Sequence, residues 1–293
     1  MLKKILCVVL LAGISFFAEN TGSFSFLTAG AGARALAMGG AFTALADDTS
    51  ALYWNPAGLV RLDIYKTHFT GMFCNMDYGR INGFAGIYEK MENGAGSAGL
   101  SLYYFRVGGI EGRDAFGILA GELEYNAGVL SVSYANIIIE GLRCGVNLKY
   151  YYASSAESTG KGFGGDLGSI IKPFGPYFSL GLAVKDINTG VAWSGGRTDY
   201  VTTTYALGAA QSIIHEKFFV SADIEGSAFL NYKYRVGSEY CISENFALRI
   251  GLNNRDFTSG FGVTYQNYKI DYAFLMDNDG FADLHRFSFS AGF

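Results

Sequence analysis

Three histidines and one acidic loop are the residues of this chain whose types could support chemistry. His68, His215 and His285 lie far apart in the sequence. A barrel-type hydrolase would need a serine beside a histidine on one strand face, with an acidic or amide residue to orient the histidine. The positions two residues from His285 hold Asp283 and Phe287 instead of serine. We therefore predict that the protein is not an enzyme.

The acidic loop Asp277-Asn278-Asp279-Gly280, followed by Asp283, resembles part of a calcium-binding loop. Calcium sites of that kind need further oxygen ligands and a glutamate at the end of the loop, which this loop lacks. The same tetrapeptide is also common in the tight turns of β-hairpins. The sequence predicts no metal and no cofactor.

Charged residues also gather in the last six apolar stretches, where they alternate with aromatic and aliphatic residues. If these stretches are strands of a barrel, the charges share its inner face. They could then form a polar conduit, or hold a segment inside the barrel. They could also form a network that neutralises itself, because buried charges need partners. This luminal charged network comprises Asp223, Glu225, Lys233, Arg235, Glu239, Arg249, Lys269, Asp271 and Arg286.

The elements that would position these residues are β-strands. From residue 64 to 293, stretches of about ten residues alternate between apolar and polar or small side chains. Near the end, Phe287 and Phe289 fall on one face, while Arg286 and Ser288 fall on the other. The second face is mostly glycine, serine and alanine, which suits a crowded barrel interior. We expect an all-β fold, a 14-stranded antiparallel transmembrane β-barrel over residues 64–293.

The composition agrees with a barrel. The chain has 24 Phe, 20 Tyr and 40 Gly among 293 residues, but 16% charged residues, against about 25% in soluble domains. Beyond the N-terminal run there is no apolar stretch of the length that a membrane helix needs. The net charge of −4 argues against a nucleic-acid partner.

The N-terminus predicts export. Lys3 and Lys4 precede an apolar run from Ile5 to Ala18, which is typical of a signal peptide, and we expect cleavage after Ala18. The protein is then expected in the bacterial outer membrane, with the surrounding lipid and the barrel insertion machinery as partners. Its C-terminal aromatic residue, Phe293, is the expected barrel-insertion signal. The cysteines left after cleavage, which form no disulfide framework, are Cys74, Cys144 and Cys241.

The connections between predicted strands alternate in length, and this predicts the orientation. Outer-membrane barrels have short periplasmic turns and longer external loops. With the C-terminus in the periplasm, the expected external loops are 108–122, 154–161, 187–200 and 276–283. The expected periplasmic turns are 136–140, 172–175, 213–216, 243–244 and Asn267.

Residues 19–63 lack the strand pattern and are rich in glycine and alanine. We expect them to form a plug in the lumen, partly helical around residues 48–54, because a 14-stranded barrel is too wide for side chains alone to fill. The plug either gates the passage or only stabilises the barrel. Its only charges between Ala29 and Leu59, Arg34, Asp47 and Asp48, should meet luminal partners or face water at the mouth. The plug or gate residues, expected near the periplasmic end, are Trp54, Asn55, Pro56, Ala57 and Gly58.

Two parts of the sequence resemble a known family. The block from Gly32 to Phe42 (GARALAMGGAF) continues through Ala46-Asp47-Asp48 to residues 53–59 (YWNPAGL). It resembles the opening of the PorV/PorQ outer-membrane proteins, which are relatives of the FadL long-chain fatty acid transporters. The ending at residues 285–290 (HRFSFS) is similar to the same group. The resemblance implies a 14-stranded barrel with an N-terminal hatch.

The resemblance leaves two functions open. FadL-like proteins take up hydrophobic molecules through the plug region and a gap in the wall, which implies passage of hydrophobic small molecules across the outer membrane. The lumen would then accept a hydrophobic ligand or a detergent-like molecule. PorV-like proteins serve type IX secretion, which implies a shuttle or anchor in a secretion or assembly machinery instead. The plug block is common to both groups, so it does not choose between them.

Overall fold

The computed structural model describes residues 24–61, 66–156, 158–214, 217–227, 232–276 and 283–293. The predicted signal peptide, His215 and the Asp277–Gly280 loop lie outside these residues. Within the described ranges, none of the helices has the length and hydropathy of a membrane span.

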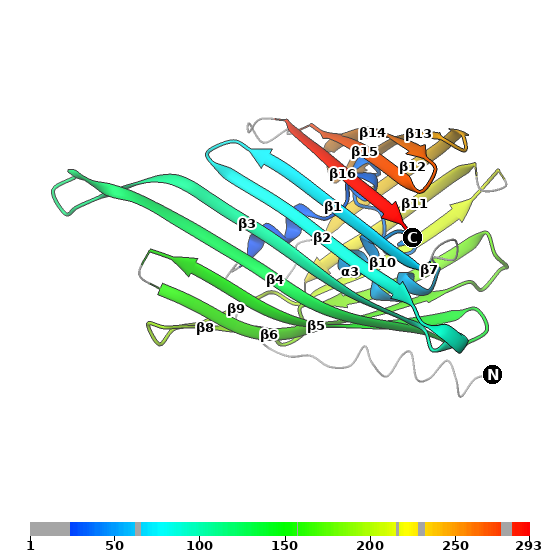
Figure 1. Cartoon of the computed structure of the whole chain (residues 1–293), viewed down its shortest axis with the longest axis horizontal. Coiled ribbons are helices and arrows are strands. Elements are labelled where there is room, and N and C mark those ends of the chain that lie inside the picture. Colours follow the sequence, from blue (N-terminus) through cyan, green and yellow to red (C-terminus); the bar gives the residue numbers. More distant parts are fainter. Residues whose placement is uncertain (1–23, 62–65, 157, 215–216, 228–231, 277–282) are drawn as a thin grey trace.

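Fourteen antiparallel strands close into a single barrel in the described part of the chain, as the alternation predicts (Figure 1). β1 pairs with β16, and β5 pairs with β6, so the ring has no open seam. The wall strands are β1 Thr67–Met76, β2 Arg80–Lys90, β3 Ser97–Arg113, β4 Leu119–Ile139, β5 Leu142–Ser155, β6 Ser158–Ile171, β7 Phe178–Lys185, β10 Thr204–Ser212, β11 Phe218–Ser227, β12 Lys233–Ser243, β13 Phe246–Asn253, β14 Asp256–Tyr265, β15 Tyr268–Leu275 and β16 Leu284–Gly292.

Two of the expected external loops contain additional strand. Within 187–200 the chain forms β8 (Gly190–Trp193) and β9 (Thr198–Tyr200). The two strands form a hairpin, and β8 pairs with residues 160–163 of β6. Within 108–122, β3 and β4 remain paired up to Arg113 and Leu119. Glycines and a bulge interrupt the apolar alternation there, so the pattern is lost although backbone pairing continues.

The wall presents apolar side chains outward and polar or small ones inward. On β16, Phe287 and Phe289 are exposed, whereas Arg286 and Ser288 are buried. The same arrangement holds for Leu100, Leu130 and other exposed aliphatic and aromatic residues around the barrel. Such a continuous apolar exterior is stable only against lipid, so the barrel spans a membrane.

Residues 24–61, called the luminal segment below, lie inside this wall. They form four short helices: η2 Ser25–Ala29, α2 Ala33–Ala37, α3 Ala51–Trp54 and η3 Pro56–Arg61. The segment approaches the strands so closely that several luminal positions accept only glycine. A Cβ atom on Gly237 would lie 2.2 Å from the Met38 carbonyl oxygen, and one on Gly181 would lie 2.3 Å from that of Thr43.

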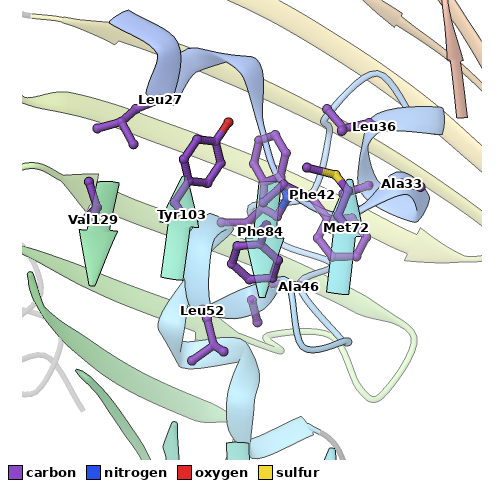
Figure 2. Close-up of a cluster of buried hydrophobic side chains, with 14 of the residues drawn as sticks. Leu27, Ala33, Leu36, Phe42, Ala46, Leu52, Met72, Phe84, Tyr103 and Val129 are labelled. Atoms are coloured by element: carbon purple, nitrogen blue, oxygen red, sulfur yellow. Dashed lines mark hydrogen bonds between the residues drawn. The ribbon is translucent and has the colours of Figure 1, made fainter. Parts of the chain in front are cut away.

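Apolar packing holds the luminal segment against the inner face of the first strands (Figure 2). Leu36, Phe42 and Leu52 of the segment are buried in one cluster with Met72 of β1 and Phe84 of β2. Full burial of a side chain of this size contributes about 1.5–3 kcal/mol. The small inward-facing residues of the wall therefore leave space in the lumen. The larger side chains of the luminal segment fill that space.

The orientation can be tested with cysteine labelling in a variant whose native cysteines are replaced by alanine. Gly195 lies between β8 and β9 with no atom within 4 Å of a Cβ built on it. Glu244 is exposed in the turn between β12 and β13. We expect an impermeant maleimide to label Gly195→Cys on intact cells and Glu244→Cys only after lysis. The reverse pattern would show that the barrel is inverted.

Candidate functional site

Arg34 of the luminal segment is the centre of the first polar group inside the barrel. Its Nη2 and Nε atoms donate to the two carboxylate oxygens of Glu239, at 2.7 and 2.9 Å. Its Nη1 atom donates to Asp47 at 2.5 Å and lies 3.3 Å from Asp48. A bidentate guanidinium–carboxylate pair fixes orientation as well as distance. Arg34 carries the one guanidinium of the described residues 29–59, and it is buried. This guanidinium therefore fastens the segment to β12.

The carboxylates around Arg34 stabilise the charge that a guanidinium carries in proteins. Burial by itself would lower the pKa of the guanidinium, but Asp47, Glu239 and Asp48 hold that pKa well above its usual range. Arg34 therefore remains charged at every physiological pH. Without Arg34, Glu239 would keep one guanidinium partner, that of Arg249, instead of two.

The ion network continues from Glu239 along the wall. Glu239 pairs with Arg249 at 2.5 Å, and Arg249 pairs with Asp271 at 2.7 Å. Arg249 and Asp271 lie on β13 and β15, with β14 between them. A Cβ atom on Gly262 of β14 would lie 2.6 Å from Arg249 Nη2 and 2.5 Å from Asp271 Oδ1, so only glycine leaves room for this bridge. Lys269 adds a longer contact with Asp271, at 3.5 Å.

A second polar group surrounds Glu225 of β11. Glu225 pairs with Lys185 at 2.6 Å and with Arg235 at 2.9 Å. The indole ring of Trp54 lies between these two cations, 5.6 Å from Lys185 Nζ and 5.5 Å from Arg235 Cζ. Cations at such distances are attracted by an aromatic ring. The luminal segment is thus held to the outer half of the barrel through Trp54.

The other predicted network residues are placed separately. Asp223 accepts hydrogen bonds from the backbone N–H groups of Phe42 and Thr43, at 2.9 and 2.8 Å. Arg286 donates to Asn82 at 3.1 Å, away from both ion groups. Lys233 lines the outer cavity described below. The nine residues therefore form two ion groups and three separate contacts. Three of the nine residues contact the luminal segment directly: Asp223, Arg235 and Glu239.

A third polar group was missed by the sequence reasoning. Lys149 of β5 lies 2.7 Å from both Asp166 of β6 and Asp186, which follows β7. The Tyr151 hydroxyl also donates to Asp186, at 2.5 Å. Lys149 could have been found by its place on the inner face of its strand. Asp186 could not, because it lies in an irregular backbone region with a φ of 58°.

Asn55 fastens the other end of the luminal segment to the wall. Its Nδ2 atom donates to the carbonyl oxygens of Thr43 at 2.8 Å and Ser169 at 3.2 Å. Its Oδ1 atom accepts from the Ala57 N–H at 3.1 Å, which closes the turn at Pro56. The turn lies near the periplasmic end of β6. Trp54, next to this turn, contacts Lys185 at the end of β7 and Arg235 of β12.

Two cavities lie on opposite sides of the luminal segment, and they share no lining residue. The periplasmic cavity, of about 540 Å³, is bounded by Asp47, Asp48 and the periplasmic ends of the strands. The outer cavity, of about 320 Å³, is bounded by Tyr53 and the external ends of β7, β10, β11 and β12. Buried residues such as Phe42 and Leu45 separate them.

The outer cavity combines paired charges with apolar surface. Its lysines Lys149 and Lys185 are held by carboxylates within 2.7 Å. Phe24, Leu27 and Tyr53 of the luminal segment provide the apolar part of the lining. A charge that is already paired has little attraction for an ion in solution, so the lining around Phe24, Leu27 and Tyr53 suits apolar molecules, while Lys233 adds a third cation to the cavity.

The two histidines among the described residues take part in packing. His68 stacks on Tyr88, with ring centroids 4.7 Å apart, and the His285 Nδ1 atom lies 2.7 Å from the Tyr272 hydroxyl. In the part of the chain that the structure describes, no group of three or more histidine, cysteine or acidic side chains is placed to hold a metal ion.

Comparison with solved structures identifies the fold. The chain aligns with the TodX monoaromatic hydrocarbon channel deltaS2 mutant at a TM-score of 0.65 and 13% identity, covering 90% of this chain and 99% of that one. The Pseudomonas putida toluene transporter TodX aligns at 0.61 and 15%, covering 89% and 96%. A Pseudomonas aeruginosa FadL homologue aligns at 0.55 and 12%, covering 85% and 94%. No protein-family model and no curated protein matches the sequence.

The chain therefore has the FadL-like fold that its N-terminal block implies. The closed 14-stranded wall, its apolar exterior and these structural neighbours together identify a barrel of the bacterial outer membrane.

Proposed function

We propose that this protein is an outer-membrane channel for small hydrophobic molecules, and that the luminal segment is its gate. The observation that carries the proposal is the segment's position between two cavities that share no lining residue. In this proposal, a shift of the segment lets a molecule bound in the outer cavity reach the periplasmic cavity.

The polar contacts that hold the luminal segment support its role as a gate more than a role as a permanent plug of the lumen. Its polar contacts include those of Arg34 with Glu239, of Asp223 with the backbone at Phe42, and of Asn55 with Ser169. Polar contacts of this kind can exchange one by one, whereas a filler needs only apolar burial. The neighbours in the comparison, named as a hydrocarbon channel and a toluene transporter, suggest the class of solute.

Uptake of N-phenyl-1-naphthylamine by intact cells tests the proposal. This uncharged probe fluoresces when it reaches an apolar environment, and an intact outer membrane excludes it. We expect cells that carry the protein to take it up faster than cells that carry an unrelated outer-membrane barrel at equal abundance. Equal uptake would refute the channel and favour the secretion or assembly role that the PorV/PorQ resemblance implies.

A further inference from the structure

Two neighbouring strands of the wall, β11 and β12, carry buried charges that do not form the pairs expected from their ladder. Asp223 of β11 lies directly opposite Arg235 of β12, and both residues are buried. Side chains directly opposite each other in an antiparallel pair share a face, with Cβ atoms about 4.5–5.5 Å apart. A salt bridge between these two residues is therefore the expected contact, but the structure has a different one.

Arg235 pairs instead with the next inward-facing carboxylate along β11. Its Nη2 atom donates to Glu225 Oε1 at 2.9 Å. Its Nε and Nη1 atoms are buried and have no hydrogen-bond partner among the described residues. A buried N–H group without a partner costs free energy. The guanidinium of Arg235 is therefore incompletely satisfied in the arrangement that the structure shows.

Asp223 is turned away from Arg235, toward the luminal segment and β10. Its Oδ2 atom accepts the backbone N–H groups of Phe42 and Thr43, at 2.9 and 2.8 Å. Its Oδ1 atom is buried and accepts no hydrogen bond from the part of the chain that the structure describes. A Cβ atom on Gly208 of β10 would lie 2.3 Å from this Oδ1 atom. Glycine at position 208 therefore gives the carboxylate room to lean away from β12.

Glu225 has a second cation, so the loss of Arg235 would not leave it unpaired. Lys185 of β7 lies 2.6 Å from Glu225 Oε2, the other oxygen of the carboxylate. Lys185 Nζ also lies 5.6 Å from the ring of Trp54, so this ring keeps a cation as well. The same charges therefore allow a second complete arrangement, in which Arg235 pairs with Asp223 while Lys185 alone holds Glu225.

We propose that Arg235 exchanges Glu225 for Asp223 when the luminal segment moves, and that this exchange stabilises the open state. When the segment leaves, Asp223 loses the two N–H donors that it has in the closed state. A buried carboxylate without a partner is costly. Arg235 removes that cost, with its Nε and Nη1 atoms as the new donors. The inference rests on the proposed gate.

The exchange gives Arg235 the opposite effect from Arg34, although both are buried guanidinium groups of the lumen. Arg34 bonds to the wall only while the segment is in place, whereas Arg235 completes its hydrogen bonds only after the segment has moved. Arg235 also lies 5.5 Å from the Trp54 ring, so a role in holding the segment is the alternative. The two roles predict opposite signs. Removal of Arg235 hinders opening if it exchanges partners and eases opening if it only holds Trp54.

The reaction of a buried cysteine with a maleimide measures movement of the segment without transport. Ala41 is fully buried beside Phe42, so Ala41→Cys, with the native cysteines replaced by alanine, should react only when the segment shifts. We expect Arg235→Met to slow this reaction about tenfold, because methionine fits beside Trp54 but gives Asp223 no partner. Arg235→Lys keeps the charge and should restore most of the rate. Only protein with the heat-modifiable mobility of a folded barrel is counted.

The matched control is Arg197→Met. Arg197 also pairs with a carboxylate, that of Asp199 at 2.7 Å, but its side chain is 74% exposed and lies outside the ion groups of the lumen. This variant should react at the rate of the unsubstituted barrel. A second variant, Lys185→Met, tests the exchange from the other side. Without Lys185, Glu225 cannot release Arg235, so the reaction should slow here too.

A double variant tests whether Asp223 is the second partner. Asp223→Asn removes the charge that needs Arg235 in the open state, so Arg235→Met should have no further effect in that background. A faster reaction in Arg235→Met would show that Arg235 only holds Trp54 and would overturn the exchange. An unchanged rate, or slowing that persists beside Asp223→Asn, would overturn it as well.

Uptake of N-phenyl-1-naphthylamine by cells that carry the same variants separates this inference from the channel. The expected pattern of cysteine reaction in a barrel that never admits the probe would refute the channel and support the exchange. Uptake with the same cysteine reaction in every variant would refute the exchange and leave the channel standing.

Discussion

Arg34→Met is expected to release the luminal segment and open the barrel to ions. The substitution removes the cation that holds Glu239, Asp47 and Asp48 together. Removing one partner of a fully buried ion pair costs roughly 3–5 kcal/mol, and the cost here is smaller because Glu239 keeps Arg249 as a partner and the side chains of Asp47 and Asp48 are 23% and 29% exposed. The wall has its own hydrogen-bond ladder, so the cost falls on the contact between segment and wall. The variant should insert normally and show a large rise in single-channel conductance in planar bilayers.

The matched control is Arg106→Met. Arg106 also forms a guanidinium–carboxylate pair, with Glu124, but both side chains are more than a third exposed. Exposed pairs contribute about 0–1 kcal/mol, so this variant should conduct like the wild type. Arg34→Lys keeps the charge but loses the bidentate geometry, and should fall between the two. Wild-type conductance of Arg34→Met at normal barrel yield would show that Arg34 does not hold the gate.

Gly237→Val is expected to open the barrel by a steric route that leaves every charge in place. A Cβ atom on Gly237 would lie 2.2 Å from the Met38 carbonyl oxygen and 2.7 Å from the Met38 Cβ, so the luminal segment must move away. Valine suits a strand, so β12 itself should tolerate it. Overpacking of this kind costs roughly 1–3 kcal/mol, which corresponds to about a tenfold to hundredfold shift toward the displaced segment.

The control for Gly237→Val is Gly83→Val on β2. There the nearest atom to a new Cβ is a backbone oxygen 3.6 Å away, which is an ordinary contact. Limited proteolysis and conductance should both distinguish the two variants. Protection of the luminal segment in Gly237→Val equal to that in Gly83→Val would contradict the close packing described here.

The wall could be predicted from the sequence because its signal is local. Alternation along each strand determined the faces and the number of strands, and connection lengths gave the expected orientation. Some strands were missed because glycines and bulges remove the alternation there. These are β8, β9 and the ends of β3 and β4 that lie next to the turn joining them. Gly108 and Gly109 of β3 are an example, since the ladder shifts register between Val107 and Ile110.

The polar contacts were predictable only in part. The charged residues were identified by their inner face, and Glu239 lies directly opposite Arg249 in the ladder of β12 and β13. Direct opposition also places Asp223 beside Arg235, yet Arg235 pairs with Glu225. The reason is that the luminal segment occupies Asp223 through two backbone N–H groups. Partners of this kind depend on a segment about 180 residues away, which no local pattern specifies.

The central claim is that passage requires movement of the luminal segment, and a reversible tether tests it most directly. The Ala33 N–H donates to Ser288 Oγ at 2.8 Å, so these two positions on the segment and on β16 are adjacent. Ala33→Cys, Ser288→Cys is made in a background where the native cysteines are alanine, and that background serves as the control. We predict that oxidation of the pair stops uptake of N-phenyl-1-naphthylamine by intact cells and that reduction restores it, while the background responds to neither. Equal uptake with the disulfide formed and reduced would contradict the gate.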